Sequence, residues 1–297
     1  MLKYMKTTIK ENLIASYQEN GGFIVHSRQM LERLYGSLGI DPKTSLDWRI
    51  FELEGISHFF QHGIARLARE LAITKDDYVL SPGEGSGAPS RFIAKLIGCR
   101  VVGVDLNPDQ ITKAKDLAFL HGIENNVDYY EQDIEELSLG KNDFTVAYCN
   151  ETCTHWENKA KAFERLFAHL KVGARVGFNA WLSGDKGSLN DAYVRVPDFK
   201  PLYQPGIWFQ NDLYTYQRLL QDAGFRIRDM RDCTDIIDIR MRARVKASVH
   251  WQRYELVMGR HARESAVRYY EGMLKTHYDY LRYGVIIAEK PVSKSAG

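Results

Sequence analysis

The stretch that decides the fold is VLSPGEGSGAPSRFIAKL, residues 79–96. A short apolar run is followed by Gly83, Gly85 and Gly87, and then by apolar residues at helical spacing. Glycine carries no Cβ and tolerates positive φ, so such a loop lets the backbone pass close to a ligand. The spacing fits G-x-G-x-G, and equally G-x-G-x-x-A ending at Ala88, which is the dinucleotide pattern of NAD enzymes. The loop alone therefore indicates a nucleotide-like cofactor without saying which one.

Strand-like runs alternate with helical patterns on both sides of this loop. A helix is expected over 57–73, with Ser57 as its N-cap and apolar residues at helical spacing. The expected strands DYVLS, RVVGVD, NVDYYEQD and DFTVAYCN end at Ser81, Asp105, Asp133 and Asn150. This alternation predicts an α/β fold, a Rossmann-like, doubly wound, mostly parallel sheet with helices on both faces. The last strand, YGVIIAEKP, follows a long helical stretch, which predicts an antiparallel edge.

The composition is that of a soluble globular protein: the chain has 297 residues, 44% of them hydrophobic and 26% charged. A net charge of +2 gives no bulk attraction to nucleic acid, and no apolar run is long enough for a membrane span. The N-terminus lacks the apolar core of a signal peptide, and the four cysteines form no C-x-x-C pair. We therefore expect a cytoplasmic protein with a small-molecule substrate, no nucleic-acid partner and no metal. A homo-oligomer is left open.

The ends of the predicted strands narrow the choice of cofactor. Asp105 lies about twenty residues beyond the glycine loop, where a carboxylate accepts the ribose hydroxyls of NAD or of S-adenosylmethionine (SAM) alike. Asp133 fits SAM better, because the segment QDIEEL can reach an adenine amino group.

At these motifs the chain resembles the class I SAM-dependent methyltransferases. The resemblance rests on VLSPGEGSG, VVGVDLNPDQITKAK, YYEQDIEEL, on DFTVAYCNETCTHW with the later HLKVGARVGF, and on the late antiparallel strand. It covers roughly residues 57–290. Within the class the chain is most similar to small-molecule methyltransferases of the sarcosine/dimethylglycine, phosphoethanolamine and sterol or tocopherol type.

The resemblance implies that SAM is the cofactor and S-adenosylhomocysteine (SAH) the product. A methyl group would pass by in-line displacement to an amine nitrogen, a carbon, or a phenol or enol oxygen of a small molecule. The implied cofactor-binding residues are Ser81, Gly83, Glu84, Gly85, Gly87, Asp105, Leu106, Gln110, Asp133, Ile134 and Asn150. Two alternatives stay open, an NAD(P)-dependent oxidoreductase with a Rossmann core and a SAM-fold protein without catalysis.

The chain departs from the family pattern at Ser81, where an Asp or Glu is usual. That acid helps to hold the methionine end of SAM in the family. Either Glu84 contacts the ammonium group in its place, or Ser81 supports the loop and Glu84 faces solvent.

The acceptor side is less well defined by sequence. His155 and Glu151 follow the fourth expected strand and are candidate general bases for a phenol or enol. Candidate substrate contacts are Tyr17, Trp156, Trp181, Arg244, Trp251 and Tyr254. Packing is the alternative for Trp156 and for the tyrosines of 250–283, and a solvated face is the alternative for Arg244. We expect an N-terminal helical cap (1–56), a SAM-binding Rossmann-like core (57–232), a helical insertion acting as a lid (233–281), and a last strand with a tail (282–297).

Overall fold

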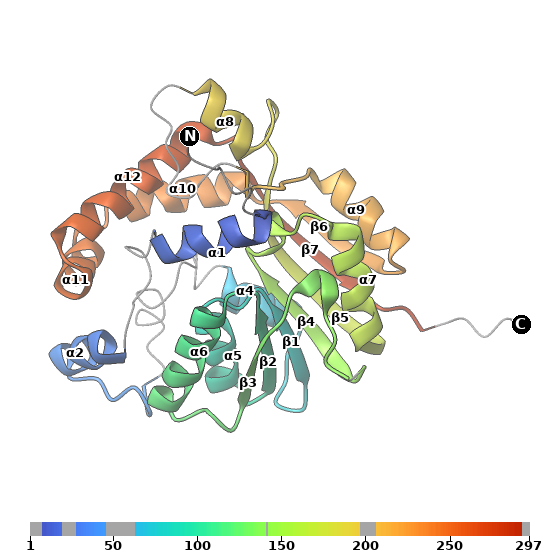
Figure 1. The fold of residues 1–297 in the computed structure, drawn as a ribbon, viewed down its shortest axis with the longest axis horizontal. Helices are drawn as coiled ribbons and strands as arrows, with labels where there is room; N and C mark the ends of the chain where they lie inside the picture. Colours follow the sequence, from blue (N-terminus) through green and yellow to red (C-terminus); the bar gives the residue numbers. More distant parts are fainter. Residues whose placement is uncertain (1–7, 20–27, 46–62, 141, 197–205, 293–297) are drawn as a thin grey trace, which may run out of the picture.

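The computed structural model describes residues 8–19, 28–45, 63–140, 142–196 and 206–292. Its centre is a seven-stranded sheet of order β3-β2-β1-β4-β5-β7-β6 (Figure 1). The strands are β1 (Tyr78–Pro82), β2 (Arg100–Asp105), β3 (Val127–Glu131), β4 (Phe144–Asn150), β5 (Leu170–Leu182), β6 (Arg226–Asp232) and β7 (Arg282–Glu289). Strands β1 to β5 pair in parallel, whereas β7 is antiparallel to both β5 and β6. The predicted α/β fold with an antiparallel last strand is therefore confirmed.

Helices cover both faces of the sheet because successive strand residues point to opposite sides. Val79 packs with α4 (Ile64–Glu70), α5 (Ala88–Ile97) and α6 (Pro108–His121). Its neighbour Leu80 packs on the other face, with α7 (Lys159–His169) and α9 (Leu213–Asp222). The parallel strands are thus buried on both sides, as their continuous apolar runs predict.

Local sequence signals fix where the helices begin and end. Asn107 caps α6, its side-chain oxygen accepting the Asp109 N–H, and Pro108 takes the first helical position. The same helix stops at Gly122, whose φ of 65° suits glycine. Of the helix expected over 57–73, the described part is α4 with its flanking turns, and Ser57 lies outside the described residues.

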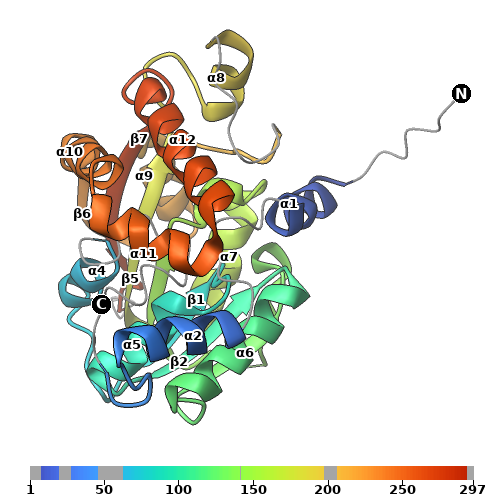
Figure 2. The ribbon, with the colours of Figure 1, turned by 90° about the vertical axis from the view of Figure 1, so that its left-hand side faces the viewer.

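Five further helices, α1 (Ile9–Glu19), α8 (Leu189–Arg195), α10 (Thr234–Val245), α11 (Ser248–Met258) and α12 (Arg260–Thr276), lie toward the carboxyl ends of the parallel strands (Figure 2). Helix α2 (Arg28–Leu38) lies beside α6. In the sequence, helices α10 to α12 stand between β6 and β7, where a helical insertion is predicted. Helix α11 packs on α2. Among the described helices, none combines the length and the apolar composition needed to cross a membrane.

Candidate active site

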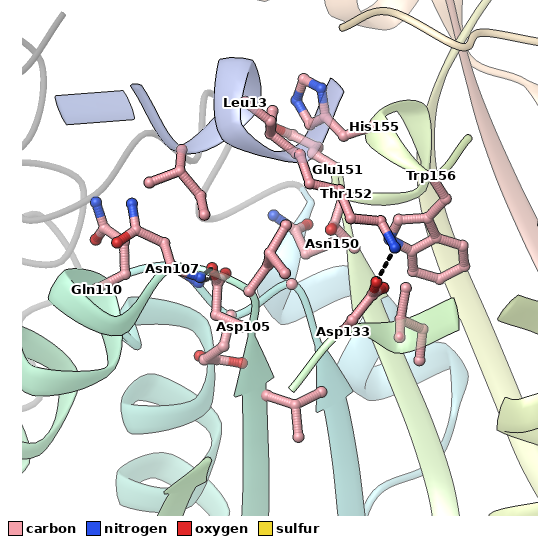
Figure 3. Close-up of a pocket in the computed structure, with 18 of the residues that line it drawn as sticks. Leu13, Asp105, Asn107, Gln110, Asp133, Asn150, Glu151, Thr152, His155 and Trp156 are labelled. Carbon is pink, nitrogen blue, oxygen red and sulfur yellow. Dashed lines mark hydrogen bonds and ion pairs between the residues drawn. The ribbon is translucent and has the colours of Figure 1, made fainter. Parts of the chain in front are cut away.

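A pocket opens at the carboxyl ends of β1, β2 and β4, where ligands of open parallel sheets bind (Figure 3). Its floor is the glycine loop and the start of α6. The segments after β3 and β4 form one side, with single residues from β5 and α12, and α1 closes the outside with Ile9, Leu13 and Ile14. The pocket therefore joins segments from nearly the whole described chain.

The three glycines of the loop have different tasks, although all have positive φ, 68° at Gly83, 58° at Gly85 and 81° at Gly87. A Cβ at Gly83 would lie 1.7 Å from the Thr152 side-chain oxygen, so this glycine allows the segment after β4 to pass over the loop. A Cβ at Gly85 would meet no protein atom within 4 Å, and Gly85 lines the pocket. Gly87 faces Tyr129 beneath the loop, outside the pocket lining.

Asp105 ends β2 and ties the loop to α6. Its carboxylate accepts the Gly85 N–H at 2.7 Å and the Asn107 N–H at 2.9 Å. Burial raises the pKa of Asp105, and the backbone hydrogen bonds from Asn107, Gly85 and Leu106 lower it. The carboxylate is thus held in place at the pocket wall, where a polar ligand can share it.

Two further polar side chains of α6 have unused hydrogen-bonding atoms at the pocket. Asn107 Nδ2 and Gln110 Oε1 are buried and have no hydrogen-bond partner among the described residues. Buried polar groups in folded proteins are almost always paired, so these two atoms indicate a polar ligand. Gln110 is a predicted cofactor residue. Asn107 is not, because the sequence shows it only as a helix cap.

The residues after β3 carry an ion pair that the sequence does not predict. Asp133 caps the short 3₁₀ turn Ile134–Glu136, accepting the Glu135 N–H at 2.9 Å. Its second carboxylate oxygen pairs with Lys10 Nζ of α1, drawn as a dashed line in Figure 3. This hydrogen bond to Asp133 raises the pKa of Lys10. Helix α1 is therefore attached to the predicted adenine side of the pocket.

Ser81 and Glu84 fit neither interpretation of the sequence fully. Glu84 does not face solvent, since only 4% of it is exposed, and it lines the pocket. Burial raises the pKa of Glu84 to about 7, and Ser81, which is buried outside the pocket lining, lowers it. The carboxylate lies under the glycine loop.

The candidate base Glu151 has a strained backbone. Its φ of 59° is uncommon for a residue with a side chain and is typical of functional sites. Its carboxylate accepts the Tyr283 hydroxyl at 3.0 Å, and Tyr283 packs edge-on against Trp181 with ring centroids 4.8 Å apart. A fully buried tyrosine of the last strand thus orients a carboxylate at the pocket.

The other candidate base, His155, is a neutral imidazole. Burial lowers the pKa of His155 to about 4. Its Nδ1 lies 2.9 Å from the Ile207 carbonyl oxygen, which can only accept a hydrogen bond, so the proton is assigned to Nδ1. The centroids of the His155 and Trp208 rings are 5.0 Å apart. A group with so low a pKa is a weak proton acceptor at neutral pH.

Aromatic side chains form much of the remaining wall. Trp156 and Trp181, both predicted from sequence, line the pocket, and so do Trp208, which is not predicted, and Tyr269, one of the aromatic residues of the insertion predicted as a lid. Tyr269 belongs to α12, far from the core motifs in sequence. Only the many aromatic residues of the insertion hint at it.

Three predicted substrate residues lie elsewhere. Arg244, Trp251 and Tyr254 are outside the pocket lining, Arg244 in α10 and the other two in α11. Trp251 Nε1 donates a hydrogen bond to the Arg244 carbonyl oxygen at 2.8 Å. The ring centroids of Trp251 and Tyr254 are 5.7 Å apart. Trp251 and Tyr254 thus pack within the insertion, and the role of all three as substrate contacts stays a prediction. Tyr17 belongs to α1, but its side chain is outside the described part.

The other predicted cofactor residues, Gly83, Leu106, Ile134 and Asn150, also line the pocket. Within the described part of the chain, no cluster of His, Cys, Asp and Glu side chains is arranged to hold a metal ion.

Comparisons with known proteins agree with this geometry. A family described as "Methyltransferase domain" matches residues 79–173. The chain is 28% identical over 180 residues to a sterol 24-C-methyltransferase of Saccharomyces cerevisiae, a match that covers 59% of this chain and 47% of the yeast protein. The chain thus spans about half the length of the curated relatives that it matches.

Two solved structures share the fold along almost the whole chain. The phosphoethanolamine N-methyltransferase 2 of Haemonchus contortus has a TM-score of 0.73 at 17% identity, covering 96% of this chain and 61% of its own. The geranyl diphosphate C-methyltransferase of Streptomyces coelicolor A3(2) has a TM-score of 0.68 at 17% identity, covering 96% of this chain and 99% of its own. Residues 79–173 therefore match a methyltransferase domain, and the chain shares the Rossmann-like fold of these two solved enzymes.

Proposed function

We propose that this class I methyltransferase-fold protein transfers a methyl group from SAM to a small-molecule acceptor. The observation that carries the proposal is the set of polar groups on one wall of the pocket. The Asp105 carboxylate, Asn107 Nδ2 and Gln110 Oε1 face the same cavity, and the last two have no partner among the described residues. A ribose with two hydroxyls satisfies such a set.

The cofactor half of the pocket would hold SAM along the ends of β1 to β3. Asp105, Asn107 and Gln110 would bind the ribose, and Asp133 with Ile134 would border the adenine. The glycine loop would contact the methionine part. SAM brings its own activated methyl group on a sulfonium, so the protein has to bind, orient and exclude water.

The acceptor half would place the nucleophile between Glu151 and the aromatic walls of Trp181, Trp208 and Tyr269. Glu151 is a better candidate than His155 for taking a proton or facing a positive charge, because the low pKa of His155 keeps its imidazole neutral. The curated relative named above is a sterol 24-C-methyltransferase, so a carbon acceptor is the first to test. Acceptors with an amine nitrogen or with a phenol or enol oxygen should be tested after it.

A lid over the pocket is supported by the position of two distant segments. Helix α1 supplies Ile9, Leu13 and Ile14 to the pocket and is tied to Asp133 by Lys10, while α12 supplies Tyr269. Such a cover would exclude water during methyl transfer. Limited proteolysis within 10–30 and 233–281 should slow when SAH and acceptor are both present, whereas equal cleavage would reject a lid.

Calorimetric titration with SAH and with NAD, followed by a radiolabelled methyl-transfer assay on a panel of carbon, amine and phenol acceptors, tests the proposal. Saturable SAH binding, no NAD binding and label in one acceptor class are expected. NAD binding alone would favour the oxidoreductase, and SAH binding without transfer would leave a SAM-fold protein without catalysis. A cytoplasmic location and a lack of nucleic-acid partners remain predictions.

A further inference from the structure

Lys159, the first residue of α7, stands where a lysine is unfavourable for two reasons. It is only 4% exposed, so its ammonium has lost nearly all contact with water. It also lies at the N-terminus of a helix, where the partial positive charge of the backbone repels a cation. A charged group is stable inside a protein only when other polar groups replace the lost water. The partners of Lys159 therefore indicate what this side chain does.

The Lys159 ammonium joins two segments of the pocket wall. Its Nζ donates one hydrogen bond to the Trp156 carbonyl oxygen at 2.9 Å and another to the Phe209 carbonyl oxygen. It also faces the Tyr216 ring of α9, with Nζ 5.9 Å from the ring centroid. Trp156 follows β4, whereas Phe209 belongs to residues 207–212, which form neither a helix nor a strand. Because that segment has no regular structure of its own, its position depends on such contacts.

Two further hydrogen bonds join the same two segments. The Phe209 N–H donates to the Thr154 carbonyl oxygen at 2.7 Å, and His155 Nδ1 donates to the Ile207 carbonyl oxygen at 2.9 Å. Between Ile207 and Phe209 stands Trp208, which lines the pocket and packs against the His155 ring. The buried ammonium itself lies outside the pocket lining, so it can act on an acceptor only through Trp208 and its neighbours.

We propose that Lys159 is a positioning residue for methyl transfer, whose buried ammonium holds Trp208 in place against the acceptor. This inference rests on the proposed function, because it concerns the acceptor half of the pocket. Without the ammonium, the Phe209 carbonyl oxygen loses a charged donor, and the segment that carries Trp208 is held less firmly. The polar groups of the cofactor half, such as Asp105, do not share this contact.

The variant Lys159→Met tests this role, because it keeps the length of the side chain and removes its charge and its donors. It should raise the KM of the acceptor found in the methyl-transfer assay by about tenfold, the equivalent of one hydrogen bond from a charged donor. SAH affinity should change by less than about twofold. Steady-state kinetics and titration calorimetry measure the two effects.

Lys290→Met is a matched control at the other end of α7. The Lys290 ammonium donates to the Phe167 and Leu170 carbonyl oxygens at 2.8 and 2.9 Å and lies 4.3 Å from the centroid of the Phe167 ring. It therefore makes the same kinds of contact as Lys159, but far from the pocket lining. This variant should leave the acceptor KM unchanged. An equal rise in KM in both variants, or an equal loss of SAH affinity and acceptor binding in Lys159→Met, would overturn the inference.

A double variant tests whether the effect passes through Trp208. Trp208→Ala removes the ring that Lys159 is proposed to hold. Adding Lys159→Met to Trp208→Ala should therefore raise the acceptor KM by less than about a further twofold, because the two substitutions act on one contact. A full tenfold rise in both backgrounds would contradict a role through Trp208.

A spectroscopic measurement on the unaltered protein needs neither an acceptor nor a folded Lys159→Met variant. Burial lowers the pKa of Lys159 to about 8, and the charge of Glu135 raises it. The near-ultraviolet circular dichroism should therefore change between pH 7 and pH 9, as the ammonium loses its proton and Trp208 becomes less constrained. This change should be absent from Trp208→Phe. A spectrum that stays constant over this range would contradict the role of Lys159.

The other titratable groups around Lys159 do not account for such a change. Burial raises the pKa of the Cys153 thiol and of the Tyr216 hydroxyl, and it lowers the pKa of His155 to about 4. Methyl transfer with an unaltered KM in Lys159→Met would overturn this inference alone. Failure of the unaltered protein to methylate any acceptor would instead reject the proposed function, and the positioning role in methyl transfer with it.

Discussion

The two halves of the pocket are built in different ways. The cofactor half comes mainly from one stretch of chain, from the glycine loop to the turn after β3, and its side chains stand at the ends of adjacent parallel strands. The acceptor half joins the end of β4, Trp181 of β5, Trp208 and Tyr269 of α12. The register of the parallel strands is enough to bring the residues of the cofactor half together. The acceptor half forms only when segments that are far apart in the sequence come into contact.

Because the two halves are built from different segments, we expect cofactor binding and methyl transfer to be affected by different substitutions. Cofactor affinity should depend on the β1–β3 ends and turnover on the residues around Glu151. The variants below test that separation, from the largest expected effect to the smallest.

Gly85→Val should abolish detectable SAH binding, a loss of more than about a hundredfold, because the new side chain would enter the pocket without touching another protein atom. Gly140→Val is a matched control, since Gly140 has a similar φ of 64° and open space around it but lies outside the pocket lining. Both variants should lose a similar free energy of unfolding, about 1–2 kcal/mol. If Gly85→Val still bound SAH normally, the loop would be only a turn.

Gly83→Val should lose SAH binding together with stability. Its Cβ would overlap the Thr152 side chain, so the segment after β4 has to move. Thermal melting and calorimetry on the same sample measure both losses. Normal melting with normal SAH binding would show that the contact between the loop and Thr152 is unimportant.

Asp105→Ala should weaken SAH by about 1.5–3 kcal/mol for each lost hydrogen bond, which is about 10- to 150-fold. The same change removes the anchors of the Gly85 and Asn107 N–H groups, so some loss of stability is expected as well. Asp105→Asn keeps the shape of the side chain and isolates the charge. Unchanged SAH affinity in a folded variant would remove Asp105 from the site.

Glu151→Gln should lower the rate of methyl transfer by about 10- to 100-fold and leave SAH affinity unchanged. Tyr283→Phe removes the hydroxyl that orients Glu151 and should have the same effect in weaker form. The test is steady-state kinetics with the acceptor found in the methyl-transfer assay. Equal loss of SAH affinity would place Glu151 in the cofactor half.

Trp251→Phe should change neither SAH affinity nor turnover. It removes the Nε1 hydrogen bond to the Arg244 carbonyl, so it should cost about 1 kcal/mol of stability through the junction of α10 and α11. Chemical denaturation measures that cost. A fall in turnover without a fall in stability would return Trp251 to the substrate contacts.

The residues of the cofactor half can be predicted from the sequence better than those of the acceptor half, and the reason is physical. The sheet, its antiparallel last strand and the strand-end position of Asp105 follow from periodicity and strand order. Trp208 and Tyr269 do not, because no local rule tells which aromatic residue of a distant loop or helix reaches the pocket. The same limit holds for Arg244 and Trp251, because no local rule separates a substrate contact from a solvated face or from helix packing.

The separation of the two halves is tested most directly by SAH titrations of Asp105→Asn and Glu151→Gln under identical conditions. The account predicts that Asp105→Asn weakens SAH by at least about tenfold while Glu151→Gln binds it like the unaltered protein. Equal weakening in both variants, or weakening in Glu151→Gln alone, would contradict it.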